Sequence, residues 1–257
     1  MRRIAAVAEY IWKQSFRNKI LNVLILFAVF AIGFSLAISE LAQESEIKMV
    51  VDFGLFAISL FAFLTVVLSM TVQLFEETEL KTLMLIMVKP IKRHEYIAGK
   101  YIGMMLTVLM NVVLMLLILM LIIKFRGGDP WDIKIFAAAM YSFLSVSILA
   151  SVAMLLSVVT TSVPSCIIFL ISVYAMGHLT VHLKSIADKS GGAAVKAVVD
   201  AIYYIVPNLE LFNMKDKIHG NLALFDAGYL GLVLGYTSLY IAVMLILTSV
   251  IFSRKEF

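Results

Sequence analysis

His178 and His182 are the residues whose type and spacing could do chemistry most directly. They lie four apart in HLTVH, so on a helix the two imidazoles share one face and could both reach one metal ion. Two ligands do not complete a site, however, and the glutamate that zinc proteases place between their histidines is missing. The alternative, two imidazoles hydrogen-bonded to water or headgroups at a membrane surface, is favoured. We expect no metal and no other cofactor in this chain.

Patterns typical of enzymes are missing from the rest of the sequence. No GxxxxGK[ST] phosphate-binding motif occurs, and no nucleophile stands out beside a base. The single cysteine, Cys166, lies in the apolar stretch SVPSCIIFLIS, which favours a packed thiol over a reactive one. The chain is therefore not expected to be an enzyme.

Charge is concentrated instead between Phe75 and Lys100, in FEETELKTLMLIMVKPIKRHEYIAGK. Acidic residues precede basic ones, which suits a helix that begins near Phe75. Pro90 would end that helix, and residues 93–99 would restart the chain. An apolar stripe follows the acidic turn, which a merely solvated loop would not need; its residues are Leu80, Leu83, Met84 and Met87. The segment 75–96 therefore predicts a docking surface for a cytosolic partner, with the solvated loop as the alternative.

The elements around this segment are long apolar runs. The chain has 257 residues, of which 62% are hydrophobic and 15% charged, and its mean hydropathy is +1.01. A helical span needs about 20 apolar residues. Six runs qualify, which predicts a single all-α polytopic membrane domain over 1–257, with spans at about 20–39, 51–74, 98–123, 134–159, 162–182 and 228–252. Pro164 would close a tight hairpin between the fourth and fifth spans.

Lys and Arg residues set the expected orientation. Twelve of the 21 fall in segments that are inside if the N-terminus is cytoplasmic, and the short loop ELAQESEIK outside is acidic. Both termini are expected in the cytoplasm, at the inner (cytoplasmic) membrane. Residues 3–17 predict an amphipathic interfacial helix rather than a frayed tail, with apolar residues at 4, 7, 8, 11, 12 and 16.

The segment 183–227 would be the large external loop. SGG at 190–192 breaks it, and AAVKAVVDAIYYIV then predicts a short apolar helix that ends before Pro207. Because this helix is too short to cross a bilayer, it is expected to be re-entrant or interfacial.

Polar residues inside the predicted spans are few, and no ionisable residue lies near the centre of one. This disfavours a stand-alone carrier or proton pump, which keeps such groups for ion sites. Four residues are candidates to line a passage, with helix packing as the favoured alternative for the deeper ones: Thr65, Ser69, Asn111 and Ser172. GKYIG and GLVLG each place two glycines four apart, at 99 and 103 and at 231 and 235, which favours close helix contact.

The charged segment resembles the first cytoplasmic loop of ABC-2-type transporter permeases. That loop often contains E-x-E-x-G-T-L, an apolar run, P-x-x-R, a hydrophobic pair and GK. The matching positions here are Glu77, Glu79, Thr82, Leu83, Pro90, Arg93, Gly99 and Lys100. Lys81 stands where the family often has glycine, so the turn there is expected to be more helical. VPNLELFN at 206–213 is similar to a segment of the nitrous-oxide-reductase maturation permeases of the same family.

The resemblance implies a permease subunit of an ATP-driven transporter, most simply an exporter. The chain, with its six spans, would form a dimer with a second copy or a sister subunit. The passage would be bordered by the second and fifth spans. A coupling helix between spans two and three would meet one of two ABC ATPase subunits, which bind ATP and Mg²⁺. The implied contacts to the ATPase are Glu76, Glu77, Glu79, Thr82, Pro90 and Arg93.

Two further readings stay open beside this one. The chain could be a membrane scaffold or maturation-type permease that recruits periplasmic partners, or, less favoured, a stand-alone carrier. Membrane lipid is an expected contact in every reading, and nucleic acid in none. The sequence leaves the substrate open.

Overall fold

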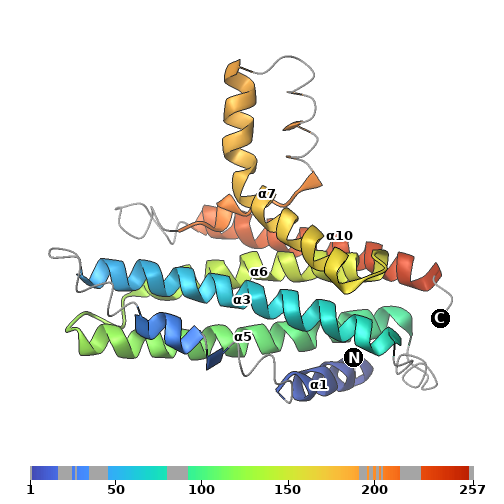
Figure 1. The fold of residues 1–257 in the computed structure, drawn as a ribbon, viewed down its shortest axis with the longest axis horizontal. Coiled ribbons are helices and arrows are strands. Elements are labelled where there is room, and N and C mark those ends of the chain that lie inside the picture. The colour runs from blue at the N-terminus through green and yellow to red at the C-terminus, as the bar shows by residue number, and fades with distance from the viewer. Residues whose placement is uncertain are drawn as a thin grey trace.

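The computed structural model describes residues 2–16, 25–26, 28–34, 46–79, 92–190, 196, 199–200, 203, 205–214 and 227–254. In that part the chain is helical, with no strand, and Figure 1 shows the helices as a bundle of long rods. The elements are α1 (Arg2–Phe16), α3 (Glu46–Glu79), α5 (Arg93–Phe125), α6 (Ile133–Val159), α7 (Val163–Ser190), the short 3-10 helix η1 (Glu210–Phe212) and α10 (Ala227–Arg254).

Five of these helices are long and apolar enough to cross a membrane: Ile47–Ser69, Arg93–Phe125, Ile133–Val159, Val163–Thr180 and Gly228–Arg254. These five candidate spans overlap five of the six predicted spans. The other predicted span, 20–39, lies largely outside the described residues, and its described parts, 25–26 and 28–34, are helical.

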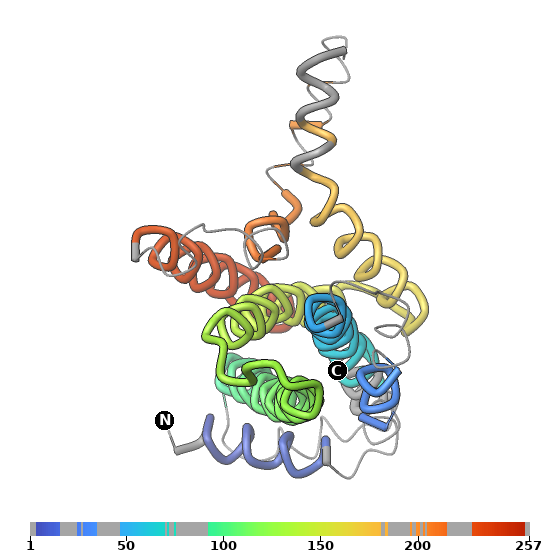
Figure 2. Tube along the Cα trace, turned by 90° about the vertical axis from the view of Figure 1, so that its left-hand side faces the viewer, coloured from blue at the N-terminus to red at the C-terminus, as the bar shows by residue number. Residues whose placement is uncertain are grey.

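Helix α6 lies at the centre of the bundle, between α3, α5 and α10 (Figures 1 and 2). Its buried positions are mostly alanine and serine, including Ala138, Ala150 and Ser151. Small side chains let neighbouring backbones approach, which drives helix association where lipid is as apolar as the protein. The composition of α6 thus explains its central place. We call the two ends of the bundle the 79–93 end and the 126–132 end, after the connections between helices that they carry.

Helix α1 packs across α5 (Figure 2), against Gly99 and Gly103 near the 79–93 end. Its apolar face is buried there, with Val7, Ala8 and Ile11 nearly inaccessible. A Cβ built on Gly99 would come within 2.7 Å of Val7, and one on Gly103 within 2.7 Å of the Ala8 carbonyl oxygen. The GKYIG spacing therefore creates the α1 docking site, and the apolar face predicted for the bilayer interface is covered by protein.

The solvent face of α1 carries an ion pair. Lys13 Nζ lies 2.6 Å from Glu9 Oε1, one turn away, and both side chains are exposed. The ammonium lowers the pKa of the Glu9 carboxyl below its usual range. An exposed pair of this kind adds little to stability.

Two helix ends differ from the sequence prediction. Helix α3 continues through Phe75 to Glu79, so the expected helix start near Phe75 is wrong. The stretch after Ser69 contains no glycine or proline to break the helix. Helix α7 runs to Ser190, eight residues beyond the predicted end of the fifth span, and its later part leaves the bundle in Figure 1. The predicted spans end where the run of apolar residues ends. In the structure, α3 and α7 continue as helices into polar sequence beyond that point.

The tight turn predicted around Pro164 is confirmed. Helix α6 ends at Val159 and α7 begins at Val163, so Pro164 occupies the first turn of α7, where its missing N–H group costs no hydrogen bond. Ser162 lies directly before α7. Its carbonyl oxygen accepts from the Cys166 N–H, and its hydroxyl donates to Ser165 Oγ.

Candidate functional site

The predicted ATPase contacts flank or fall within the connection between α3 and α5 in the sequence. The backbones of Glu76, Glu77 and Glu79 form the last turns of α3, and their side chains lie outside the described residues. Thr82 and Pro90 also fall outside the described part of the chain. Segment 80–91 connects α3 to α5 along the chain. The coupling role of these residues stays a prediction.

Arg93, the first residue of α5, is bonded to the last turn of α10. Its Nη1 donates to the carbonyl oxygens of Phe252 at 2.8 Å and Ser253 at 3.0 Å. Its guanidinium also lies 5.9 Å from the centre of the Phe252 ring. The last carbonyls of a helix have no partner within the helix and carry partial negative charge, so a cation there is favourable. We call these two hydrogen bonds the Arg93 clamp.

Lys100 is a buried cation close to the clamp. Its side chain is inaccessible, and its Nζ lies 3.4 Å from Tyr96 Oη and 5.7 Å from the centre of that ring. Tyr96 stacks in turn on Phe252 of α10, with ring centroids 6.1 Å apart. The positively charged start of α5 is thus packed against both α1 and α10.

Thr65 and Asn111 join two helices in the bundle core. The Asn111 amide donates to Thr65 Oγ1 at 2.8 Å, and the Thr65 hydroxyl donates to the Phe61 carbonyl oxygen at 2.8 Å. Both side chains are buried. This geometry supports the packing alternative within one chain, and a place beside a passage in an assembly stays a prediction.

The other two passage candidates differ in exposure. Ser69 is fully buried, and its hydroxyl has no hydrogen-bond partner within the described part of the chain. Ser172 lies on the exposed face of α7, and its hydroxyl donates to the Ile168 carbonyl oxygen at 2.9 Å. The structure therefore does not bring the four candidates together on one surface of the chain.

The two histidines do not form a metal site with the residues described. His178 contacts Glu210, with 3.9 Å between Nδ1 and Oε2, and packs edge-on against the Tyr174 ring. The side chain of His182 lies outside the description. Among the described residues no group of three His, Cys, Asp or Glu side chains could hold a metal ion.

A folded segment, residues 205–214, covers the side of α7 that carries His178. The Leu209 N–H donates to the Gly177 carbonyl oxygen at 3.1 Å, and a Cβ on Gly177 would come within 2.7 Å of the Leu209 side chain. The Asn208 N–H donates to the hydroxyl oxygen of Tyr236 in α10 at 3.0 Å. Val206 and Pro207 are buried. The helix predicted before Pro207 lies largely outside the described residues, and its described positions 196, 199–200, 203 and 205 are helical. The segment is thus fixed to both α7 and α10.

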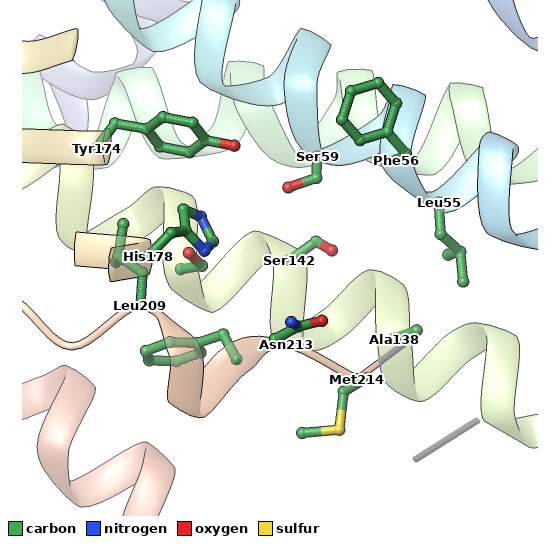
Figure 3. A pocket seen from close by; sticks show the side chains of 12 residues that line it. Leu55, Phe56, Ser59, Ala138, Ser142, Tyr174, His178, Leu209, Asn213 and Met214 are labelled. Atoms are coloured by element: carbon green, nitrogen blue, oxygen red, sulfur yellow. The ribbon is translucent and has the colours of Figure 1, made fainter. Parts of the chain in front are cut away.

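Beneath this segment lies a cavity of about 360 Å³ between α3, α6 and α7. Figure 3 shows its lining side chains directed into a common space. Six of the twelve lining residues are polar: Ser59, Ser142, Ser145, Tyr174, His178 and Asn213. We call this cavity the polar pocket.

The polar pocket was not predicted from the sequence. Its serines come from two helices that are far apart along the chain, and none belongs to a motif. A weak signal was present in α6, where Ser142 and Ser145 lie three apart and so share a helix face.

The comparisons with known proteins give the family. A family model described as ABC-2 family transporter protein matches residues 58–257, well over half of the chain. No curated protein matches the sequence. The match begins within α3 and includes the charged segment, the Arg93 clamp and ten of the twelve residues that line the polar pocket. The chain belongs to the ABC-2 transporter family, and it is a multi-pass membrane protein and a permease component of an ABC transporter.

Proposed function

We propose that this chain is the permease subunit of an ATP-driven exporter. Two copies, or one copy and a sister subunit, form the passage, and each receives a separate ABC ATPase subunit that binds ATP and Mg²⁺. The 79–93 end faces the cytoplasm of the inner membrane, together with both termini. Loop 126–132 and segment 183–227 lie outside.

The observation that carries this proposal is the arrangement at the 79–93 end. Segment 80–91 joins α3 to α5, and the first residue of α5 is bonded to the last turn of α10. Helix α1 packs against the same part of α5, at Gly99 and Gly103. A partner that pushes on segment 75–96 would therefore move three spans and α1 together, as a coupling element must.

The test is to reverse the acidic charge of this segment. Glu77→Lys/Glu79→Lys should lower association with the ATPase subunit and substrate-stimulated hydrolysis, while the permease still inserts. Removing a docked carboxylate, which leaves its partner unpaired, costs roughly 2–5 kcal/mol. Removing a solvated carboxylate costs only about 0–1 kcal/mol. Glu9→Lys is the matched control, because Glu9 is an exposed glutamate on α1. Unchanged complex yield and hydrolysis in the double variant would restore the solvated-loop alternative.

The passage is proposed to run between α3 and α7 of the paired chains. Ser172 supports this placement because it lies on an exposed, otherwise apolar face of α7 with Ile168 and Phe169. Thr65, Ser69 and Asn111 are buried between helices of one chain. They would border the passage only when α3 and α5 separate during transport.

A second candidate function is a maturation-type permease that recruits a partner outside the membrane. The folded segment 205–214 favours it, since this stretch has its own hydrogen bonds and fixed contacts to α7 and α10. The same stretch carries the similarity to nitrous-oxide-reductase maturation permeases. The two proposals can be separated with an ATPase subunit that cannot hydrolyse ATP. A permease that only recruits a partner, without transport, would bind its external partner equally well with that subunit.

A further inference from the structure

The hydroxyl groups of the polar pocket differ from most other hydroxyls of the membrane-spanning helices. Most serine and threonine side chains there donate to a carbonyl oxygen of their own helix, three or four residues back; they are Thr65, Thr107, Ser147, Ser151, Ser157, Ser172, Thr180, Thr237, Ser238 and Thr248. Such back-bonding is the usual way for a hydroxyl to be satisfied in lipid.

Four hydroxyls that line the polar pocket make no hydrogen bond to any part of the chain that the structure describes; they are Ser59, Ser142, Ser145 and Tyr174. The Tyr174 ring is held in place by stacking on Phe63, at 4.2 Å between centroids, and by the edge of His178. In Figure 3 its hydroxyl points towards Ser59 and into the pocket. None of these four oxygens is sealed away from solvent, so all four are open to hydrogen bonds with a polar occupant of the pocket.

The remaining polar groups of the pocket are positioned by one carboxylate. Asn213 Nδ2 donates to Glu210 Oε1 at 2.9 Å, and His178 Nδ1 lies 3.9 Å from Glu210 Oε2. Among the described residues that line the pocket there is no lysine, arginine, aspartate or glutamate. This described lining offers hydroxyl, amide and imidazole groups rather than the permanent cation that would attract a phosphate or carboxylate group.

Apolar side chains complete the lining, among them Phe56, Phe212 and Met214. The volume of about 360 Å³ is at the lower end of the range of roughly 300–1,000 Å³ found for small-molecule sites. A ligand that suits this lining carries several uncharged hydroxyl groups and also an apolar face.

We propose that the polar pocket binds a neutral, hydroxyl-rich sugar unit, either free or as the headgroup of a glycoside with an apolar tail. Ser59, Ser142, Ser145 and Tyr174 exchange hydrogen bonds with its hydroxyls, and Phe56 and Phe212 pack on its C–H face. The site lies within one chain at the 126–132 end, so binding needs neither the ATPase subunit nor the passage, and its failure would leave the proposed function standing.

Equilibrium dialysis of the full-length chain in phosphatidylcholine nanodiscs tests this inference, with empty nanodiscs subtracted. The probes are radiolabelled methyl β-D-glucoside, octyl β-D-glucoside below its micellar concentration, octanol and octyl sulfate. We expect saturable binding of one glucoside per chain and none of octanol or octyl sulfate. Binding of the methyl glucoside alone would identify a free sugar, and a preference for the octyl glucoside would identify a lipid-linked one.

The variant Ser59→Ala/Ser142→Ala/Tyr174→Phe removes three of the unbonded hydroxyls and keeps the ring stacking. We expect its affinity for the glucoside to fall about tenfold or more, since each neutral hydrogen bond is worth roughly a factor of two to ten. Ser147→Ala is the matched control, because this α6 serine bonds back to the Phe143 carbonyl oxygen outside the pocket. Equal affinity in the triple variant, non-saturable binding, or stronger binding of octyl sulfate overturns the proposal.

A labelling experiment keeps the test decisive if the triple variant folds poorly. Ser142→Cys in a Cys166→Ala background should react with a small thiol reagent, and the glucoside should slow that reaction. Trp131→Cys, at an exposed position of the same end, is the control that the glucoside should not protect. Equal labelling rates at position 142 with and without glucoside would contradict binding in the pocket.

Discussion

The Arg93 clamp predicts that the first residue of α5 stabilises the last turn of α10. Arg93→Ala removes two hydrogen bonds from a charged donor, of 2.8 and 3.0 Å. A hydrogen bond involving a charged group contributes about 1.5–3 kcal/mol, and one nitrogen shared by two partly exposed carbonyls falls near the lower end. We expect a loss of about 2–3 kcal/mol, including roughly 0.5 kcal/mol from the contact with the Phe252 ring.

Arg93→Lys should lie between the alanine variant and the natural chain. A lysine ammonium keeps the favourable charge at the helix C-terminus, worth about 0.3–1 kcal/mol, but it lacks the planar guanidinium that reaches both carbonyls. The matched control is Arg254→Ala. Arg254 is also an arginine in the last turn of α10, but it is exposed, so its loss should cost less than about 0.5 kcal/mol.

Thermal unfolding in detergent and hydrogen exchange together measure the effect. With a shift of about 2–4 °C per kcal/mol for a chain of this size, Arg93→Ala should lower Tm by about 5–10 °C and Arg254→Ala by no more than about 2 °C. Exchange should rise in peptides covering 245–254 in the Arg93→Ala variant. Equal shifts in the two alanine variants, or unchanged exchange at the end of α10, would refute the clamp.

Two other predictions follow from the packing and one from the distribution of Lys and Arg residues. Gly103→Ala should destabilise the docking of α1 and expose it to protease, because the new Cβ would meet the Ala8 backbone at 2.7 Å, whereas Gly235→Ala, with nothing within 4 Å, should leave digestion unchanged. A double-mutant cycle with Thr65→Ala and Asn111→Ala should give a coupling of about 0.6 kcal/mol, up to roughly 1.7 kcal/mol, by reversible unfolding; zero coupling would mean that the 2.8 Å hydrogen bond adds nothing. A single cysteine introduced by Ser190→Cys in a Cys166-free chain should be labelled from outside the cell only. Labelling from the cytoplasmic face alone would contradict the predicted orientation.

Helix existence was predictable from the sequence because the apolar runs are long and contain no central charge. Five spans and the turn at Pro164 follow from this, and so does α1, whose apolar residues recur at helical spacing. The contact that holds α1 was partly predictable as well. Gly99 and Gly103 indicated a close approach, but the spacing could not say which helix would approach, and Gly231 and Gly235 have the same spacing with nothing within 4 Å in this chain.

The contacts that matter for function were harder to predict because they join residues far apart in the chain. The Arg93 clamp links positions 159 and 160 residues apart, and a carbonyl acceptor leaves no mark on the sequence. The polar pocket depends on serines that look the same in sequence as the back-bonded Ser147 or Ser151. Only the packing of α3, α6 and α7 decides which hydroxyls face a cavity.

The measurement that tests the central claim most directly is ATP hydrolysis by a candidate ABC ATPase from the same organism, measured alone and with the chain in nanodiscs. If the chain is the permease subunit, the two proteins should form a complex with two copies of the ATPase, counted by native mass spectrometry. Hydrolysis should depend on the permease and fall in the Glu77→Lys/Glu79→Lys variant but not in Glu9→Lys. A chain that forms no complex with that ATPase and leaves its hydrolysis unchanged would contradict the account.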